Sequence, residues 1–492
     1  MAVFPHFHVI VLADDYGEKL WPIAREQAPA CFAPLAPDSP ESLLSATISS
    51  ISEFTAYPIR IVTTGALHEL VADEIAARTD LDASAYDVMA LPVQRGSAFS
   101  IALACACARR EDPDAVVAVF RADERIDADD RLGSLLYRAY QVALRDRIVL
   151  VGAERAEKPA DVAYIRFGRQ YANVEGAFEV RHFAADAKLS AAQRSIDEGG
   201  CWYTGIFVAR AAQVLGALAY SGDSDGAPGE FGTGRIGDTA GFLALLDRTS
   251  WLRPEARELI EALPAASFEE TVLEPTVNLV VMPTSIRFKA HNSLEDIDAH
   301  LAPDAAGNRI DGSAVVVEGR DTTVIEQAGT RSVVAYGVSG LLVVDTPDAL
   351  LVADKAQARD AGTLLRELKA ARLPQLAQAA RRPFPWGEAV LLAVNGATAT
   401  WQLSLRAGAS FDTLHIPAAY GMFDGPWEHF EGTLHEEYTV AQGAVRVEGY
   451  GSGAARRPVP TARSFGVDGS EAKRVSCAGE TSAMLILTAA LV

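Results

Sequence analysis

Residues 8–22, HVIVLADDYGEKLWP, join a continuous apolar run to a polar loop that contains a single glycine. A continuous apolar run of this length is typical of a strand that is buried on both faces, as in a parallel sheet. Similar runs stand at residues 59–64 (IRIVTT), 115–120 (AVVAVF) and 147–152 (RIVLVG). Ligands of such sheets bind beyond the carboxyl ends of the strands, so the loops that follow residues 13 and 120 are the first candidate sites.

Segments with helical spacing lie between these runs. HELVADEIAART (68–79) and RLGSLLYRAYQVALRD (131–146) repeat apolar residues at intervals of three and four. This alternation of strands and helices predicts an α/β domain over residues 1–300, with a Rossmann-like, mostly parallel sheet wrapped by helices.

The pattern changes after residue 305. Closely spaced strands without helices between them, such as SAVVVEG (313–319) and GLLVVDT (340–346), predict an all-β coil. A helix follows at about residues 354–372, so this β-coil linker with its helix spans 305–375. After a proline-rich stretch, residues 383–492 are again strand-rich and predict a small β-barrel.

Composition and charge exclude several classes of protein. The 492 residues include 44 Lys and Arg against 65 Asp and Glu, a net charge of −21 that repels phosphate backbones and anionic lipids. We therefore expect neither nucleic acid nor membrane as a partner. The five cysteines form no CxxC pair, and the amino terminus lacks the basic region of a signal peptide. These features predict a soluble, cytoplasmic chain with reduced thiols.

Residues 12–25, LADDYGEKLWPIAR, resemble the first loop of the mannose-1-phosphate guanylyltransferases, LSGGxGTRLWPLSR. Further resemblances follow in the family's order. They are LPVQRGSAFSIALA (91–104), RADE (121–124), WYTGIF (202–207), GVSGLLVVDTPDALLV (337–352) and RPFPWG (382–387). The last of these corresponds to the start of the isomerase domain in the bifunctional form of the family. The chain is therefore identified as a divergent member of the mannose-1-phosphate guanylyltransferase and type II mannose-6-phosphate isomerase family.

The resemblance implies a nucleotidyltransferase-like domain, a β-coil linker and a cupin-like barrel. It also implies a site for a nucleotide or nucleotide sugar and a sugar phosphate, with Mg²⁺ as the cofactor. The implied nucleotide-binding residues are Gly17, Lys19, Arg25, Arg95 and Ser97, with Lys19 also catalytic, and the implied sugar-binding residues are Trp202, Thr204 and Gly205. Asp123 corresponds to a magnesium ligand, although a helix N-cap is an equal alternative, and the segment around Trp202 is equally well explained as a packed strand.

The phosphate-binding groups of the family are largely replaced. Asp14 and Asp15 stand at the paired glycines of the first loop, where two carboxylates would repel a polyanion by about 4 kcal/mol per charge pair at 4 Å and an effective dielectric of 20. Ala30 and Asp186 fall where relatives carry lysines, and Ala290 falls where they carry a second magnesium ligand. One alternative is that Asp14, Asp15 and Asp123 together hold a divalent cation.

The barrel shows a similar loss. The isomerases carry HxHRxEHW, whereas residues 432–438 read GTLHEEY, so only Glu436 matches. His429, His435 and Glu436 offer at most an improvised zinc site. We expect instead that they are polar residues of a barrel without zinc, and that isomerase activity is lost.

Two functions from different classes follow. The first is a guanylyltransferase-like protein of GDP-mannose metabolism, and so of polysaccharide precursor supply, whose classical activities are impaired or lost. The alternative is a non-catalytic nucleotide-sugar-binding or regulatory subunit that pairs with an active paralogue. A homodimer is a further expectation, based on the resemblance alone.

Overall fold

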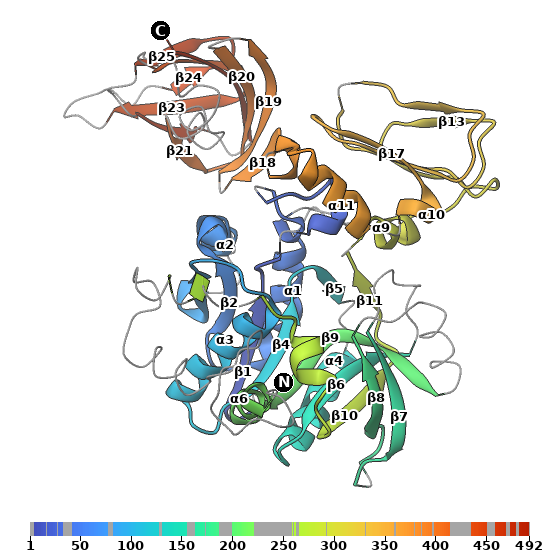
Figure 1. Ribbon diagram of the computed structural model, residues 1–492. Coiled ribbons are helices and arrows are strands. Elements are labelled where there is room, and N and C mark those ends of the chain that lie inside the picture. Colours follow the sequence, from blue (N-terminus) through green and yellow to red (C-terminus); the bar gives the residue numbers. More distant parts are fainter. Residues whose placement is uncertain are drawn as a thin grey trace.

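The computed structural model divides into an α/β domain, a β-coil and a barrel (Figure 1). It describes residues 4–15, 17–26, 28–32, 42–76, 82–126, 130–154, 163–172, 174–185, 199–220, 258, 260–261, 265–291, 293–329, 331–358, 361–377, 379–384, 386–395, 398–413, 434–449, 458–468, 473–478 and 482–491. Among the helices in these ranges, none is both long enough and apolar enough to cross a membrane.

A nine-stranded sheet in the order β3-β2-β1-β4-β9-β6-β10-β8-β7 forms the centre of the first domain. The strands are β1 (Phe7–Leu12), β2 (Ile59–Thr64), β3 (Tyr86–Leu91), β4 (Val116–Arg121), β6 (Ile148–Ala153), β7 (Tyr164–Gln170), β8 (Phe178–Ala184), β9 (Gly200–Arg210) and β10 (Leu279–Thr284). Strands β3, β2, β1 and β4 are parallel, whereas β9 runs antiparallel between β4 and β6. The predicted fold class is confirmed.

Helices cover both faces of this sheet because its strands are apolar on both sides. Along β1, Val9 and Val11 pack into one core while Ile10 packs into the other. The helices are α1 (Leu43–Ile51), α2 (His68–Ala76), α3 (Ser97–Glu111), α4 (Asp130–Ala143) and α6 (Ala211–Tyr220). The first core includes side chains of α1, α2 and α4, and the second includes those of α3 and α6.

The β-coil is built mainly from parallel pairs. Its strands are β12 (Arg309–Asp311), β13 (Val315–Val317), β14 (Thr323–Glu326), β15 (Val334–Tyr336), β16 (Leu341–Asp345) and β17 (Leu350–Asp354). β12, β14 and β16 form one parallel ladder, and β13 and β15 form another. Within the helical segment predicted after them, the described residues form α10 (Lys355–Ala358) and α11 (Ala361–Ala370).

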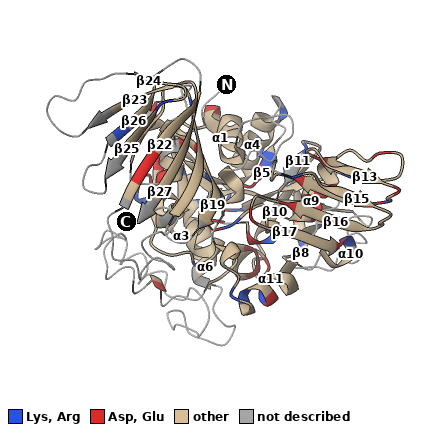
Figure 2. Cartoon of the chain, turned by 90° about the horizontal axis from the view of Figure 1, so that it is seen from above, with Lys and Arg blue, Asp and Glu red and all other residues tan. Residues whose placement is uncertain are grey.

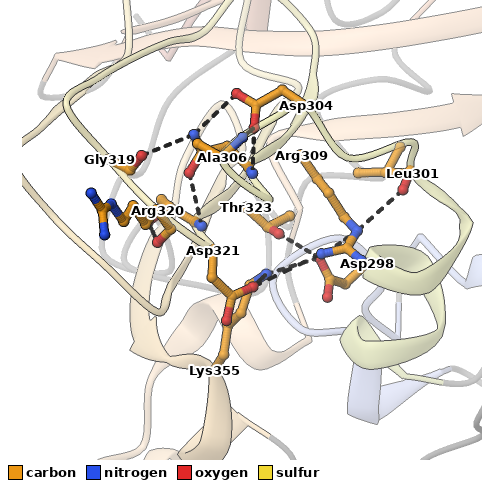
Figure 3. Close-up of polar contacts among 12 residues, drawn as sticks. Asp298, Leu301, Asp304, Ala306, Arg309, Gly319, Arg320, Asp321, Thr323 and Lys355 are labelled. Carbon is orange, nitrogen blue, oxygen red and sulfur yellow. Dashed lines mark hydrogen bonds and ion pairs between the residues drawn. The ribbon is translucent and has the colours of Figure 1, made fainter.

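A polar network joins the coil to α9 (Leu294–His300), the last helix of the first domain (Figure 3). Asp298 of α9 accepts a hydrogen bond from the Thr323 hydroxyl and lies 3.9 Å from Arg309. Lys355 lies 3.4 Å from Asp298 and 3.0 Å from Asp321. Because the cations and carboxylates alternate, the network fixes the first turn of the coil against the α/β domain.

The barrel consists of two antiparallel sheets around an aromatic core. One sheet contains β18 (Arg381–Phe384), β19 (Gly387–Asn395), β20 (Thr398–Leu405), β27 (Ala483–Leu491), β22 (Leu434–Gln442) and β25 (Ser464–Asp468). The other contains β21 (Ser410–Asp412), β26 (Lys473–Cys477), β23 (Ala444–Gly449) and β24 (Pro458–Pro460). Trp401, Tyr438 and Phe411 lie in the core between them.

Arg25 lies at the junction of all three parts, outside the cleft described below. Its side chain is only 2% exposed. It donates hydrogen bonds to Asp348 at 2.5 Å and to the Thr346 hydroxyl at 3.2 Å. The same Asp348 oxygen accepts the backbone N–H of Ala380, just before the barrel, at 3.1 Å. Arg25, expected to bind nucleotide, is thus a buried contact between the first loop and the coil.

Replacing Arg25 by alanine should destabilise the chain, because Asp348 would lose a buried ionic partner. We expect a loss of about 3 kcal/mol in the free energy of unfolding, measured by urea denaturation. Arg169→Ala is the matched control, since Arg169 also pairs with a carboxylate, Glu179 at 2.8 Å, but is 84% exposed. That control should cost under about 1 kcal/mol, and equal effects of the two substitutions would contradict the structural role of Arg25.

Candidate functional site

A cleft of about 570 Å³ opens beyond the carboxyl ends of β1 and β4, where the sequence predicted a site. It is lined by the first loop, the end of β4, the start of β5 (Glu124–Ile126) and the middle of β9. The rest of its lining includes Ser267, Glu269, Glu270, His291, Ser293 and Asp296. Segments distant in the sequence therefore meet at one edge of the sheet.

The first loop is closed on itself. Gly17 adopts a left-handed conformation (φ 72°), and a Cβ atom at this position would lie 3.0 Å from the Cβ of Ala30. The Gly17 N–H donates a 2.8 Å hydrogen bond to the Asp15 carboxylate, so this amide already has an acceptor within the loop. Gly17 and Lys19 both line the cleft, as the resemblance implies.

Asp14 belongs to the first loop, but its side chain makes its hydrogen bond with α3, the helix that follows β3. Its carboxylate accepts a hydrogen bond from the Ser100 hydroxyl in α3, and its backbone carbonyl accepts one from Gln94 at 2.8 Å. Burial raises the pKa of Asp14 to about 6. Within the described residues, no group of three or more His, Cys, Asp or Glu side chains is arranged to hold a metal ion. The cation site considered between Asp14, Asp15 and Asp123 therefore gains no support from the geometry.

The Arg121 guanidinium occupies the end of β4. It donates two hydrogen bonds to Asp123, at 3.0 and 2.6 Å, and lies 3.7 Å from Asp15. The Asp123 carboxylate holds the pKa of Arg121 well above its usual value. Gly205 makes room for this arginine, because its φ is +75° and a Cβ atom there would lie 2.7 Å from the Arg121 Cδ.

Asp123 is therefore poorly suited to bind Mg²⁺. Both of its oxygens face a guanidinium, and it lies in the turn between β4 and β5, so it is not a helix cap either. In β11 (Phe288–Ala290), Ala290 pairs with Glu124 across the strands and supplies no carboxylate. The residues present do not fit the magnesium site that the family resemblance implies.

Glu124 was not identified from the sequence. Its side chain is 8% exposed, lines the cleft, and has one carboxyl oxygen, Oε2, without a hydrogen-bond partner in the described structure. Burial is the main cause that raises the pKa of Glu124 to about 8, and the charge of Asp123 adds to it. This group is consequently protonated in most molecules at neutral pH.

The lining of the cleft is strongly acidic. Its acidic residues are Asp15, Glu18, Asp123, Glu124, Glu269, Glu270 and Asp296, against Lys19 and Arg121 as the cationic ones. The sequence alone predicted that carboxylates of the first loop would repel a polyanion. The others come from three distant segments, and only the fold reveals that they share one cleft.

Two of the predicted nucleotide-binding residues hold a neighbouring segment in place. Arg95 donates hydrogen bonds to the backbone carbonyls of Ile260 and Glu261, at 3.0 and 2.6 Å. The Ser97 hydroxyl accepts the Phe268 N–H at 2.9 Å and lines a smaller adjoining cavity. Arg95 therefore holds residues 260–261, and Ser97 holds Phe268, which stands between two lining residues of the cleft, Ser267 and Glu269.

The predicted sugar-binding residues divide in the same way. Trp202 is 5% exposed and belongs to the buried part of β9. The Thr204 hydroxyl donates to the Val151 carbonyl at 2.9 Å, inside the sheet. Of the three, only Gly205 lines the cleft. The packed-strand explanation therefore describes Trp202 and Thr204.

The improvised zinc site in the barrel is not assembled by the described residues. β22 carries two successive acidic residues, drawn red in Figure 2. Glu436 is fully buried and accepts a 3.1 Å hydrogen bond from the Tyr438 hydroxyl, whereas His435 is exposed. Adjacent residues of a strand point to opposite faces, so these two cannot share an ion. His429 lies outside the described residues.

Comparison with known proteins agrees with this architecture. Residues 8–220 match the nucleotidyl transferase family, and residues 312–368 match the MannoseP isomerase/GMP-like beta-helix domain. A mannose-1-phosphate guanylyltransferase of Escherichia coli K12 is 27% identical over 370 residues, 73% of each chain. One from Salmonella muenchen is 24% identical over 405 residues, 82% of each chain.

A similar relative and a solved structure extend this comparison. The alginate biosynthesis protein AlgA of Pseudomonas aeruginosa PAO1 is 25% identical over 81% of this chain and 80% of its own. The crystal structure of a mannose-1-phosphate geranyltransferase from Thermus thermophilus has the same fold, with a TM-score of 0.58 at 21% identity. It covers 74% of this chain and 99% of its own. The family resemblance inferred from the motifs is confirmed.

The buried Glu124 predicts a stability that falls as the pH rises. Its pKa is 4.5 when unfolded and about 8 when folded, so between these values the folded chain keeps a proton that the unfolded chain has lost. The free energy of unfolding must then decrease from about pH 5 to pH 8. Gln cannot ionise, so Glu124→Gln should flatten this slope and exceed the wild type at pH 8 by a few kcal/mol, on the order of 1.4 per pKa unit.

Urea denaturation at several pH values between these limits measures the effect. Glu53→Gln is the control, because Glu53 is exposed, and its curve should run parallel to that of the wild type. A parallel curve for Glu124→Gln as well would show that Glu124 titrates normally in the folded chain.

Proposed function

We propose that this relative of the mannose-1-phosphate guanylyltransferases no longer transfers a guanylyl group and acts as a non-catalytic binding protein of nucleotide-sugar metabolism. The observation that carries the proposal is the pair of hydrogen bonds, at 3.0 and 2.6 Å, by which Arg121 occupies both oxygens of Asp123. By resemblance, this carboxylate is the one that would hold a metal ion in an active relative.

Nucleotidyl transfer depends on positioning the phosphates and neutralising their charge. In this cleft Ala30 stands where the resemblance places a lysine, and Asp15 and Glu269 add negative charge to the lining. Repulsion of about 4 kcal/mol per close charge pair, at an effective dielectric of 20, corresponds to a loss of roughly a thousandfold in affinity. The negative charge of the lining therefore disfavours binding of a triphosphate and, with it, guanylyl transfer.

The cleft itself is nevertheless retained. Its volume of about 570 Å³ suits a small polar molecule, and Gly17 and Gly205 keep their places in its lining. A preserved cavity with altered charges supports binding without transfer. Retained guanylyl transfer is the second candidate, and the position of Lys19 in the lining favours it.

Pyrophosphate release separates these two candidates. With GTP, mannose 1-phosphate and Mg²⁺, the purified chain should release no pyrophosphate above the protein-free background. The Escherichia coli K12 mannose-1-phosphate guanylyltransferase serves as the positive control. Release that Lys19→Ala abolishes would establish the second candidate instead.

Removing Arg121 should create a cation site, because Asp123 and Asp15 would lose the positive charge between them. We expect Arg121→Ala to bind Mn²⁺ with a dissociation constant on the order of 1 mM, as read from electron paramagnetic resonance. The wild type should bind none at this position. Adding Asp123→Asn to Arg121→Ala should remove the new site. Mn²⁺ binding by the wild type that Asp123→Asn alone abolishes would contradict this account.

A further inference from the structure

Two buried polar atoms in the lining of the cleft lack hydrogen-bond partners in the described part of the chain. They are the Oε2 atom of Glu124, in β5, and the hydroxyl of Tyr203, in β9. Glu124 is only 8% exposed, so bulk water does not readily reach it. Buried polar groups of native proteins are almost always satisfied by protein, ordered water or a ligand. Each of these two atoms therefore has an unused hydrogen-bonding capacity that a ligand could satisfy.

The surrounding charges indicate the sign of that ligand. Asp123, Asp296 and Glu269 all lie close enough to Glu124 to interact with it electrostatically. The neighbouring cation, Arg121, donates its hydrogen bonds to Asp123 at 3.0 and 2.6 Å. A phosphate placed beside Glu124 would meet mainly negative charge, whereas a positively charged group would be attracted.

An organic cation fits this environment better than a metal ion. A metal needs several ligands in a fixed geometry, and no group of three or more ligating side chains is arranged for one among the described residues. An ammonium group needs only acceptors, because it carries three rotatable donors. Ser267, Ser293 and Tyr203 add hydroxyl groups to the lining, and hydroxyls are suited to a polyhydroxylated ligand.

We propose that the cleft binds a small polyhydroxylated ligand that carries an ammonium group. The Glu124 carboxyl group is the partner of the ammonium, whose positive charge would favour the ionised form of Glu124. The Tyr203 hydroxyl is a partner of a ligand hydroxyl. This inference rests on the proposed loss of guanylyl transfer, because an active transferase would bind the opposite charge at the same place. The ligand class of the cleft is therefore amino sugars, in place of sugar phosphates.

Isothermal titration of the full chain with glucosamine and glucose tests the proposal. These two sugars differ in one group, an amine against a hydroxyl. Glucosamine should bind roughly tenfold or more tightly than glucose at low salt, and the difference should shrink at high salt. Mannose 1-phosphate should bind more weakly than either sugar.

Variants locate the interaction. Glu124→Gln should remove most of the preference for glucosamine, whereas Glu53→Gln, at an exposed position outside the cleft, should leave it unchanged. Tyr203→Phe should weaken both sugars by a similar factor. Equal binding of glucosamine and glucose, tighter binding of mannose 1-phosphate, or a preference that survives Glu124→Gln would overturn the proposal.

The outcome is separable from that of the proposed function. Pyrophosphate release by the same preparation would contradict the loss of transfer, whatever the titrations show. Absence of release together with equal binding of the two sugars would leave the loss of transfer standing and reject the ammonium site.

Discussion

The contact between Arg121 and Asp123 is the constraint on which the chemistry of the cleft depends. A guanidinium matches a carboxylate with two parallel donors and is charged at every physiological pH. Gly205 leaves the space that its side chain needs, and Asp15 lies on its other side at 3.7 Å. Unlike a bound metal ion, this cation is part of the chain and cannot leave with a product. A positive charge held by two carboxylates thus stands in a mainly acidic cleft.

Most of the fold could be predicted because its central strands are continuous apolar runs. The observed bounds of β1, β2, β4 and β6 lie within one residue of those runs. Other features depend on tertiary contacts. In the helical segment expected after the coil, α10 packs against β16 and β17, whereas α11 packs against the short helix Glu18–Leu20. No local pattern distinguishes these two surroundings.

The site was less predictable. A motif shared with a family indicates common descent, but it does not show which contacts its residues make in this chain. Arg95 and Arg25 keep the residue type that resemblance assigns to nucleotide binding, yet their guanidinium groups bind backbone carbonyls and Asp348. Arg121 and Glu124 flank the expected metal ligand in the sequence. Their importance becomes visible only when Gly205 and Asp296 are brought beside them from more than 80 residues away. What the sequence did indicate was the pair of carboxylates, Asp14 and Asp15, in the first loop.

The position of Asp348 has a consequence for how this chain can be divided or recombined. One carboxylate oxygen accepts both the Arg25 guanidinium and the Ala380 amide, so three architectural units share a single acceptor. A cut between the coil and the barrel near residue 380 would therefore disturb the acceptor that also holds Arg25. When domains are exchanged between relatives, Arg25, Asp348 and the backbone at Ala380 must be transferred together. Otherwise the buried Arg25 guanidinium would lose its carboxylate partner.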